Sequence, residues 1–198
     1  MDARLGTVSD LDGVVRTLVE AFHEDPVWSW AFPDREARAA QHAIVFEMTV
    51  AHAIAHDAVW LTSGCGAVVT AFPPGVNEMS DADTERFPTL LTGLLGGHAD
   101  AVTQLFERFE HARPLHIPHL YVSMLGVRNE SRGQGIGMAL LAEVVRHADE
   151  HGIGVYLESS NGANDARYEA AGFQPYGSIP VAPGRPPVTT MWRGPVAP

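Results

Sequence analysis

The chain has 198 residues, of which 45% are hydrophobic and 19% charged, a composition typical of a globular protein with a full core. Its net charge of -11, without any Lys- or Arg-rich run, argues against binding to a nucleic-acid backbone and favours cationic partners. The single cysteine, Cys65, excludes an internal disulfide, and neither a leader nor a membrane-spanning apolar run is evident. These features predict a cytoplasmic protein with no membrane partner.

The N-terminal half alternates strands and helices. In chain order, the hydrophobic spacing predicts a strand at 4–8, a helix capped by Ser9 or Asp10 and ending near Phe22, an aromatic-rich loop at 23–33, a helix from Asp34 to about His56, and strands from Ala58 and from Gly66 joined by a tight turn.

The C-terminal half continues this alternation, which indicates one α/β domain. Its predicted elements are a helical region at 80–112 broken near Gly96, a buried strand at 119–127, a glycine-rich turn at 132–137, an amphipathic helix ending at Gly152, a strand at 153–159, a short helix at about 164–171, and two final strands from Gly172 and at 188–193.

The most informative segment is the turn between the strand at 119–127 and the next helix. Three glycines, Gly133, Gly135 and Gly137, lie where that helix begins. The first N–H groups of a helix have no intrahelical partner and carry partial positive charge, so they can bind phosphate. Glycine at these positions leaves room for a diphosphate to approach the backbone. The pattern suits a diphosphate-bearing cofactor.

Three other structures also use glycines of this kind. A dinucleotide-binding fold needs G-x-G-x-x-G, whereas the spacing here is G-x-G-x-G, although Glu158 does end the next strand as that fold requires. A P-loop needs Gly-Lys-Ser/Thr, which Gly137-Met138-Ala139 does not supply. The glycines also suit a turn that merely lets the helix pack closely on the strand.

With its surroundings, this segment resembles the GNAT superfamily of acyl-CoA N-acyltransferases. The acetyl-CoA motif of that family, Arg/Gln-x-x-Gly-x-Gly/Ala, is similar to the run Arg132-Gly133-Gln134-Gly135-Ile136-Gly137. The family's Asn-x-x-x-Tyr and Gly-Phe are similar to Asn164, Tyr168 and Gly172-Phe173. The runs FHEDPVW, YVSMLGV and LESS further resemble the branch that contains puromycin N-acetyltransferase. Asn129 and Arg167 depart from the family, which often has proline and an aromatic residue there.

The resemblance implies an α/β GNAT fold, with a mixed central sheet of about seven strands, splayed fourth and fifth strands and flanking helices. One N-acetyltransferase domain would span residues 1–198, with a cofactor-binding core at about 117–192. The donor would be acetyl-CoA, without a metal. The residues that the resemblance assigns to this donor are Leu125, Gly126, Val127, Arg132, Gly133, Gln134, Gly135, Ile136, Gly137, Met138, Asn164 and Tyr168.

The family transfers the acetyl group directly to an amine, without an acetyl-enzyme. The resemblance implies that Tyr168 protonates the departing thiolate and that a backbone N–H near Leu125 polarises the thioester carbonyl. Glu158 is the candidate base that deprotonates the acceptor amine. Each residue also has a plain structural interpretation: Tyr168 can pack a short helix on the sheet, Glu158 can be a surface carboxylate, and Asn164 can be a helix N-cap.

The expected acceptor is the amine of a small molecule, such as an antibiotic-like or nucleoside amine. Glu24 and Asp25 can attract a cationic substrate, and Trp28, Trp30 and Phe32 can either wall its pocket or close the core. The alternatives are acetylation of a protein or peptide, and a non-catalytic acyl-CoA-binding module. A homodimer is one expected oligomeric state.

The ten histidines raise the question of a metal site. His52 and His56 have helical i, i+4 spacing, and His116 and His119 form H-x-x-H. Neither pair comes with cysteine or with glutamate in the arrangement of zinc hydrolases, so we expect no metal.

Overall fold

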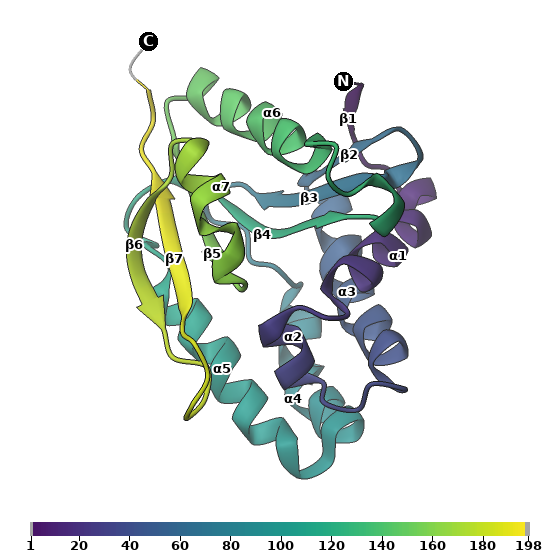
Figure 1. Cartoon of the computed structure of the whole chain (residues 1–198). Helices are drawn as coiled ribbons and strands as arrows, with labels where there is room; N and C mark the ends of the chain where they lie inside the picture. The colour runs from purple at the N-terminus through teal and green to yellow at the C-terminus, as the bar shows by residue number, and fades with distance from the viewer. Residues whose placement is uncertain (1, 197–198) are drawn as a thin grey trace.

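The structure is a computed structural model and describes residues 2–196 (Figure 1). One seven-stranded sheet with the order β1-β2-β3-β4-β5-β7-β6 organises the chain, which confirms the predicted mixed α/β fold. Its strands are β1 (Ala3–Leu5), β2 (Val59–Thr62), β3 (Ala67–Phe72), β4 (His119–Val127), β5 (Gly154–Ser159), β6 (Gln174–Ile179) and β7 (Val188–Arg193).

The helices pack on both faces of this sheet. They are α1 (Leu11–Phe22), α2 (Pro26–Ala31), α3 (Arg38–Ala55), α4 (Asp81–Leu95), α5 (Ala99–Ala112), α6 (Ile136–Glu150) and α7 (Asp165–Ala170). One hydrophobic core joins the sheet to α1, α3, α4 and α5, and a second core joins the opposite face to α6 (Figure 1). Each amphipathic helix therefore buries its apolar stripe on a sheet face.

The sheet is mostly antiparallel. Among the described strands, β4 and β5 form the one parallel pair, and α6 connects them. A dinucleotide-binding fold is built on a mainly parallel sheet. The topology therefore excludes that interpretation of the glycine-rich turn, even though Glu158 lies near the end of β5.

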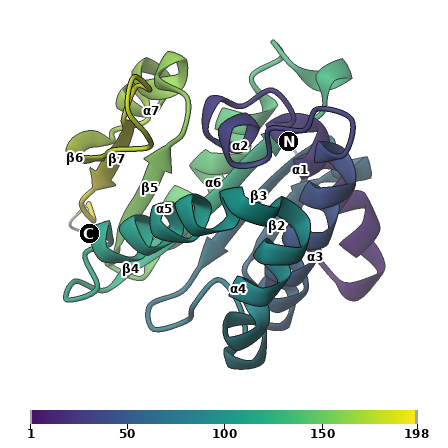
Figure 2. The same cartoon turned by 90° about the horizontal axis from the view of Figure 1, so that it is seen from below.

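The two central strands separate partway along their length, as predicted. The pairing of β4 with β5 runs from His119 opposite Gly154 to Val122 opposite Leu157 and then stops. Beyond it, β4 stays paired with β3, while β5 stays paired with β7 as far as Ser159. A bulge in β4 at Ser123, which the register of β3 skips, lies where the separation begins. Figure 2 shows β5, β6 and β7 turning away together from β3 and β4.

The segment at 23–33, predicted as a loop, contains a helix. The Asp25 side chain accepts hydrogen bonds from the N–H groups of Val27 (2.9 Å) and Trp28 (3.1 Å), and Pro26 occupies the first helical position. An acidic N-cap followed by proline is a helix-start signal, which outweighs the turn preference of an isolated proline. The prediction of a loop was wrong because it gave no weight to this helix-start signal at Asp25 and Pro26.

Most other boundaries agree with the predictions. The break near Gly96 is confirmed, since α4 ends there and Gly96 has a φ of +55°. The first strand is shorter than predicted, because Val8 already begins a 3₁₀ turn. Within residues 2–196, none of the helices has both the length and the apolar character that crossing a membrane requires.

Candidate active site

A cavity of about 930 Å³ occupies the separation between β4 and β5. It extends from the start of α6, past the free edge of β4 and the end of β5, to α4 and α5. Most of the predicted site residues line it: Glu24, Asp25, Trp28, Leu125, Val127, Arg132, Gly133, Gly135, Ile136, Gly137, Met138, Glu158, Asn164 and Tyr168. Gly126, Gln134, Trp30 and Phe32 do not line it.

The end of β4 presents backbone groups to this cavity along the edge that no strand pairs with. The N–H groups of Met124 and Arg128 point toward β3, where they donate to Thr70 Oγ1 (3.0 Å) and to the Gly66 carbonyl (3.0 Å). Because backbone groups alternate along a strand, those of Leu125 and Val127 face the opposite edge, from which β5 has turned away. Gly126 has a packing role instead, since a Cβ there would lie 2.9 Å from Leu18 of α1.

The entrance to α6 presents a row of free N–H groups. In residues 2–196, no acceptor is hydrogen-bonded to the backbone N–H groups of residues 133–138. Gly133 and Gly135 have φ values of +77° and +75°, and the space beyond each Cα is open. Left-handed backbone of this kind is the region that glycine adopts without strain. The turn therefore has the free N–H groups and the open space that binding of an anion requires, and residues 132–138 are named the cradle below.

Gly137 differs from the other two glycines. A Cβ at Gly137 would lie 2.6 Å from Val127 Cγ2 and 3.4 Å from Leu125 Cδ2, both on β4. The absence of a side chain at this position lets α6 pack directly on the strand. Close packing, which was one of the competing interpretations of the motif, thus explains Gly137, while the open space at Gly133 and Gly135 suits an anion.

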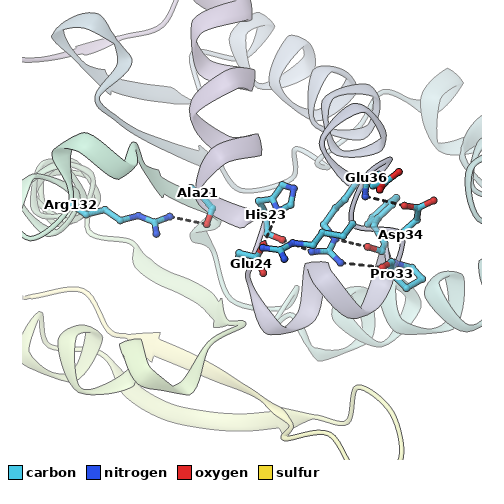
Figure 3. A network of polar contacts seen from close by, with 10 residues as sticks. Ala21, His23, Glu24, Pro33, Asp34, Glu36 and Arg132 are labelled. Atoms are coloured by element: carbon cyan, nitrogen blue, oxygen red, sulfur yellow. Dashed lines mark hydrogen bonds and ion pairs between the residues drawn. The ribbon is translucent and has the colours of Figure 1, made fainter.

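The Arg132 side chain lies at the edge of the cradle (Figure 3). Its guanidinium donates to the carbonyl of Ala21 at 3.2 Å and to the carbonyl of Val127 at 3.3 Å. These contacts tie the glycine-rich turn to the C-terminal end of α1, where a positive charge is favourable. Arg132 is exposed, so its charge also contributes to the positive potential at the cradle.

Tyr168, on α7, lines the cavity from the side of β5. Burial and the nearby Asp25 raise the pKa of its hydroxyl to about 12, so the phenol keeps its proton at neutral pH. Asn164 does not cap a helix through its side chain. Its Oδ1 accepts a hydrogen bond from Arg167 at 2.8 Å, and Asn161 caps the preceding turn instead.

Glu158 lies just beyond the last β4–β5 pair. Burial and the neighbouring Glu78 raise the pKa of its carboxyl to about 8, against the opposing effect of Tyr121 and Tyr156. Its Oε1 is buried and has no hydrogen-bond partner among the described residues. Such a group is the kind of titratable residue found at functional sites.

Four residues beside Glu158 were missed by the sequence analysis. Glu78, in the segment after β3, accepts a hydrogen bond from the hydroxyl of Ser123 at the β4 bulge. Tyr121 extends from β4, and the guanidinium of Arg113 lies 4.7 Å from the centre of its ring. These residues come from segments far apart in the sequence and converge only in the folded chain, where β4 and β5 part. No local sequence motif therefore marks them.

The early acidic residues lie at the cavity but are engaged with protein groups. Glu24 is exposed and pairs with Arg35 (2.9 Å) and His23 (3.1 Å) (Figure 3). Asp25 caps α2 and accepts a hydrogen bond from Ser160 at 2.7 Å, which fastens α2 to the segment after β5. These contacts give Asp25 a structural role that the sequence analysis did not foresee.

The three aromatic residues of the early segment divide between cavity and core. Trp28 lines the cavity while its ring packs against Phe46 at 4.6 Å between ring centres. Phe32 is fully buried, and Trp30 packs against His98 at 5.0 Å. The position of Trp28 is thus compatible with the predicted pocket wall. Trp30 and Phe32 lie away from the cavity, which agrees with the alternative prediction that they close the core.

The histidine pairs take part in packing. His52 and His56 contact each other at 4.3 Å between ring centres, and His119 packs against Tyr156 and Trp192. Within the described part of the chain, no group of three or more His, Cys, Asp or Glu side chains is placed to hold a metal ion.

Known proteins are similar to this chain in sequence or in fold. The chain is 32% identical over 149 residues to a probable toxin TacT of Sinorhizobium fredii, which covers 64% of this chain and 82% of that relative. Its fold is similar to that of a histone acetyltransferase HPA2 and related acetyltransferase from Corynebacterium glutamicum, with a TM-score of 0.70, 24% identity, and 99% and 97% of the two chains covered. It is also similar to arylalkylamine N-acetyltransferase 2 of Aedes aegypti, with a TM-score of 0.70, 14% identity and 98% of each chain covered.

The model of the acetyltransferase (GNAT) family matches residues 80–173. This range contains α4 and α5, which line one end of the cavity (its far end), together with the free edge of β4, the glycine-rich turn and Tyr168. The sheet order, the separation of β4 from β5 and the cradle at α6 all lie within a fold that the solved acetyltransferases share. The chain belongs to the acetyltransferase (GNAT) family and is an N-acetyltransferase.

Proposed function

We propose that this enzyme uses acetyl-CoA to acetylate the amine of a small molecule, and that residues 1–198 form one domain with a cofactor-binding core at about 117–192. The observation that carries the proposal is a single cavity that joins the free N–H groups at α6 to Tyr168 and Glu158. An anion cradle, an acid and a base on one continuous space are what direct acetyl transfer requires.

The residues around the cavity fit this donor. The N–H groups of residues 133–138 bind the diphosphate, with Arg132 adding positive charge at the edge. The backbone groups of Leu125 and the N–H of Val127, on the edge of β4 that faces the cavity, hold the pantetheine arm as a neighbouring strand would. Acetyl-CoA supplies an activated thioester, and the N–H of Leu125 stabilises the negative charge that develops on its oxygen. Asn164 completes the wall of this side of the cavity.

Tyr168 and Glu158 handle the protons. Glu158, once ionised, takes a proton from the acceptor ammonium, which frees the nitrogen lone pair for attack. Tyr168 gives its proton to the departing thiolate. A thiol has a pKa near 8.5, so its thiolate is already a fair leaving group, and we expect the acid to contribute about ten- to a hundredfold in rate.

A small acceptor is favoured by the far end of the cavity. Side chains of α4 and α5, including Phe87 and Phe106, line it, and both residues are at least partly buried. The Aedes aegypti enzyme with a similar fold is named for its acceptor, an arylalkylamine, which is a small amine. The relation to the branch that contains puromycin N-acetyltransferase, and a homodimer, remain predictions from the sequence.

Release of CoA from acetyl-CoA, measured with a panel of small amines and of peptides, tests the proposal. Activity with small amines is expected, and Tyr168→Phe is expected to lower kcat. Activity confined to peptides would favour a protein acetyltransferase. Binding of acetyl-CoA without release of CoA for any acceptor would favour a non-catalytic module.

A further inference from the structure

Two carboxyl groups from segments far apart in the sequence line the end of the cavity between β5 and the helices α4 and α5, here named the acceptor end. Glu78 follows β3, and its Oε1 accepts the hydrogen bond of Ser123. Glu158 extends from the end of β5, and its Oε1 is buried without a partner among the described residues. Both side chains line the cavity. A buried carboxylate oxygen without a partner is costly, so a ligand with a donor group is expected to meet it.

The groups around this pair carry an excess of negative charge. Tyr121 influences the pKa of both carboxyl groups, and Tyr156 that of Glu158. Among the described residues, Arg113 is the cation that lowers the pKa of both carboxyl groups, and its guanidinium also pairs with Glu110 and lies over the ring of Tyr121. Of the described residues, the arginines that line the cavity are Arg132 and Arg167, near α6 and on α7. The acceptor end therefore favours a cation.

We propose that Glu78 and Glu158 form a carboxyl pair that holds one proton between them, binds the acceptor ammonium and receives its proton. This inference rests on the proposed acetyl transfer. In the step, one N–H bond of the ammonium breaks, an O–H bond forms on the ionised carboxyl group, and the electron pair stays on nitrogen. Mutual repulsion keeps one of two adjacent carboxyl groups protonated, and burial strengthens this effect. Burial raises the pKa of both carboxyl groups, and the neighbouring Glu78 raises that of Glu158 further.

The same arrangement defines the acceptor class. The walls next to the pair are aromatic: Phe87, Phe106 and Phe109 line this end of the cavity. Because the pair already carries one negative charge, an acceptor that places a carboxylate beside its amine would bring a second one next to Glu78 and Glu158. The pair therefore selects a primary amine on an apolar or aromatic body and rejects α-amino acids.

The role of Glu78 is tested with Glu78→Gln, using phenethylamine as the acceptor. The matched control is Glu107→Gln, which removes the same charge from an exposed position of the cavity lining on α5. Loss of a charge-assisted contact is expected to raise the KM for phenethylamine about tenfold or more. Without Glu78 nearby, Glu158 ionises more readily, so the acidic limb of the kcat/KM profile moves to lower pH by about one unit. The Kd for acetyl-CoA stays unchanged in both variants.

A merely structural Glu78 would not move the pH profile. If Glu78→Gln keeps the wild-type KM and acidic limb while the enzyme acetylates phenethylamine, the carboxyl pair is refuted and the proposed function stands. If the wild type acetylates no amine, the proposed function fails and the pair fails with it.

A measurement on the wild type covers the case in which Glu78→Gln does not fold. The ratio of kcat/KM for phenethylamine to that for phenylalanine, which adds a carboxylate beside the amine, is expected to exceed about a hundredfold. A ratio near one would overturn the assigned acceptor class.

Discussion

Replacing Gly135 by alanine separates cofactor binding from folding. Gly135 has a φ of +75° and open space beyond its Cα, so a methyl group there meets no protein atom. Gly184, in the connection between β6 and β7, has the same φ of +75° and the same open surroundings, but it does not line the cavity. Gly184→Ala is therefore a matched control for the backbone strain of the substitution.

An L-residue in left-handed backbone costs about 1–2 kcal/mol, so both variants should lose that much stability. For a chain of this length, each kcal/mol corresponds to a fall in Tm of about 2–4 °C. In Gly135→Ala alone, the methyl group occupies the space where the diphosphate approaches the N–H groups of residues 133–138. Losing one or two charge-assisted hydrogen bonds, at about 1.5–3 kcal/mol each, raises the Kd for acetyl-CoA about tenfold or more.

Isothermal titration calorimetry with acetyl-CoA gives the Kd, and thermal denaturation gives the Tm. The expected pattern is an equal loss of Tm in the two variants and a loss of affinity in Gly135→Ala alone. If both variants bind acetyl-CoA within twofold of the wild type, the cradle at α6 does not hold the diphosphate, and the reasoning is refuted.

Three further predictions concern proton transfer and packing. Tyr168→Phe should lower kcat about ten- to a hundredfold while the Kd for acetyl-CoA is unchanged, and steady-state kinetics with calorimetry check both. The kcat/KM of the wild type should rise with pH up to about 8, because Glu158 acts as a base only after losing its proton, and Glu158→Gln should abolish this limb in a pH–rate profile. Gly137→Ala should lower the Tm by several degrees, since its Cβ would clash with Val127 at an overpacking cost of about 1–3 kcal/mol, and it should cost less acetyl-CoA affinity than Gly135→Ala.

Each of these predictions has a result that contradicts it. An unchanged kcat in Tyr168→Phe would assign the proton to water or to another group. A pH profile in which Glu158→Gln retains the limb near pH 8 would remove Glu158 from the role of base. A Gly137→Ala variant with the wild-type Tm would show that α6 and β4 tolerate a side chain between them.

The cofactor side of the site was predictable from sequence because local physics determines it. A buried strand, a glycine-rich turn and an amphipathic helix are adjacent in the chain, so their periodicity places the cradle without knowledge of the rest of the fold. The same reasoning did not distinguish Gly137 from the other two glycines. Its role depends on how closely α6 approaches Val127, a distance that no spacing of glycines reveals.

The acceptor side was not predictable because its residues converge only in three dimensions. Glu78 and Tyr121 have no motif around them, and they meet Glu158 because β4 and β5 separate after Val122. The aromatic segment at 23–33 shows a second limit. Composition indicated many large side chains there, but it did not decide that Trp28 would line the cavity while Phe32 entered the core.

The most direct test of the proposed diphosphate site compares the affinities of two ligands for the wild type, each measured in its own calorimetric titration. Acetyl-CoA carries the diphosphate and the phosphorylated adenosine beyond it, whereas acetylpantetheine presents the same thioester arm without either. The account predicts saturable binding of acetyl-CoA at one site, with a Kd below about 1 mM and at least about tenfold tighter than for acetylpantetheine. Equal affinity for the two ligands, or no binding of acetyl-CoA, would contradict the assignment of the α6 entrance as the diphosphate site.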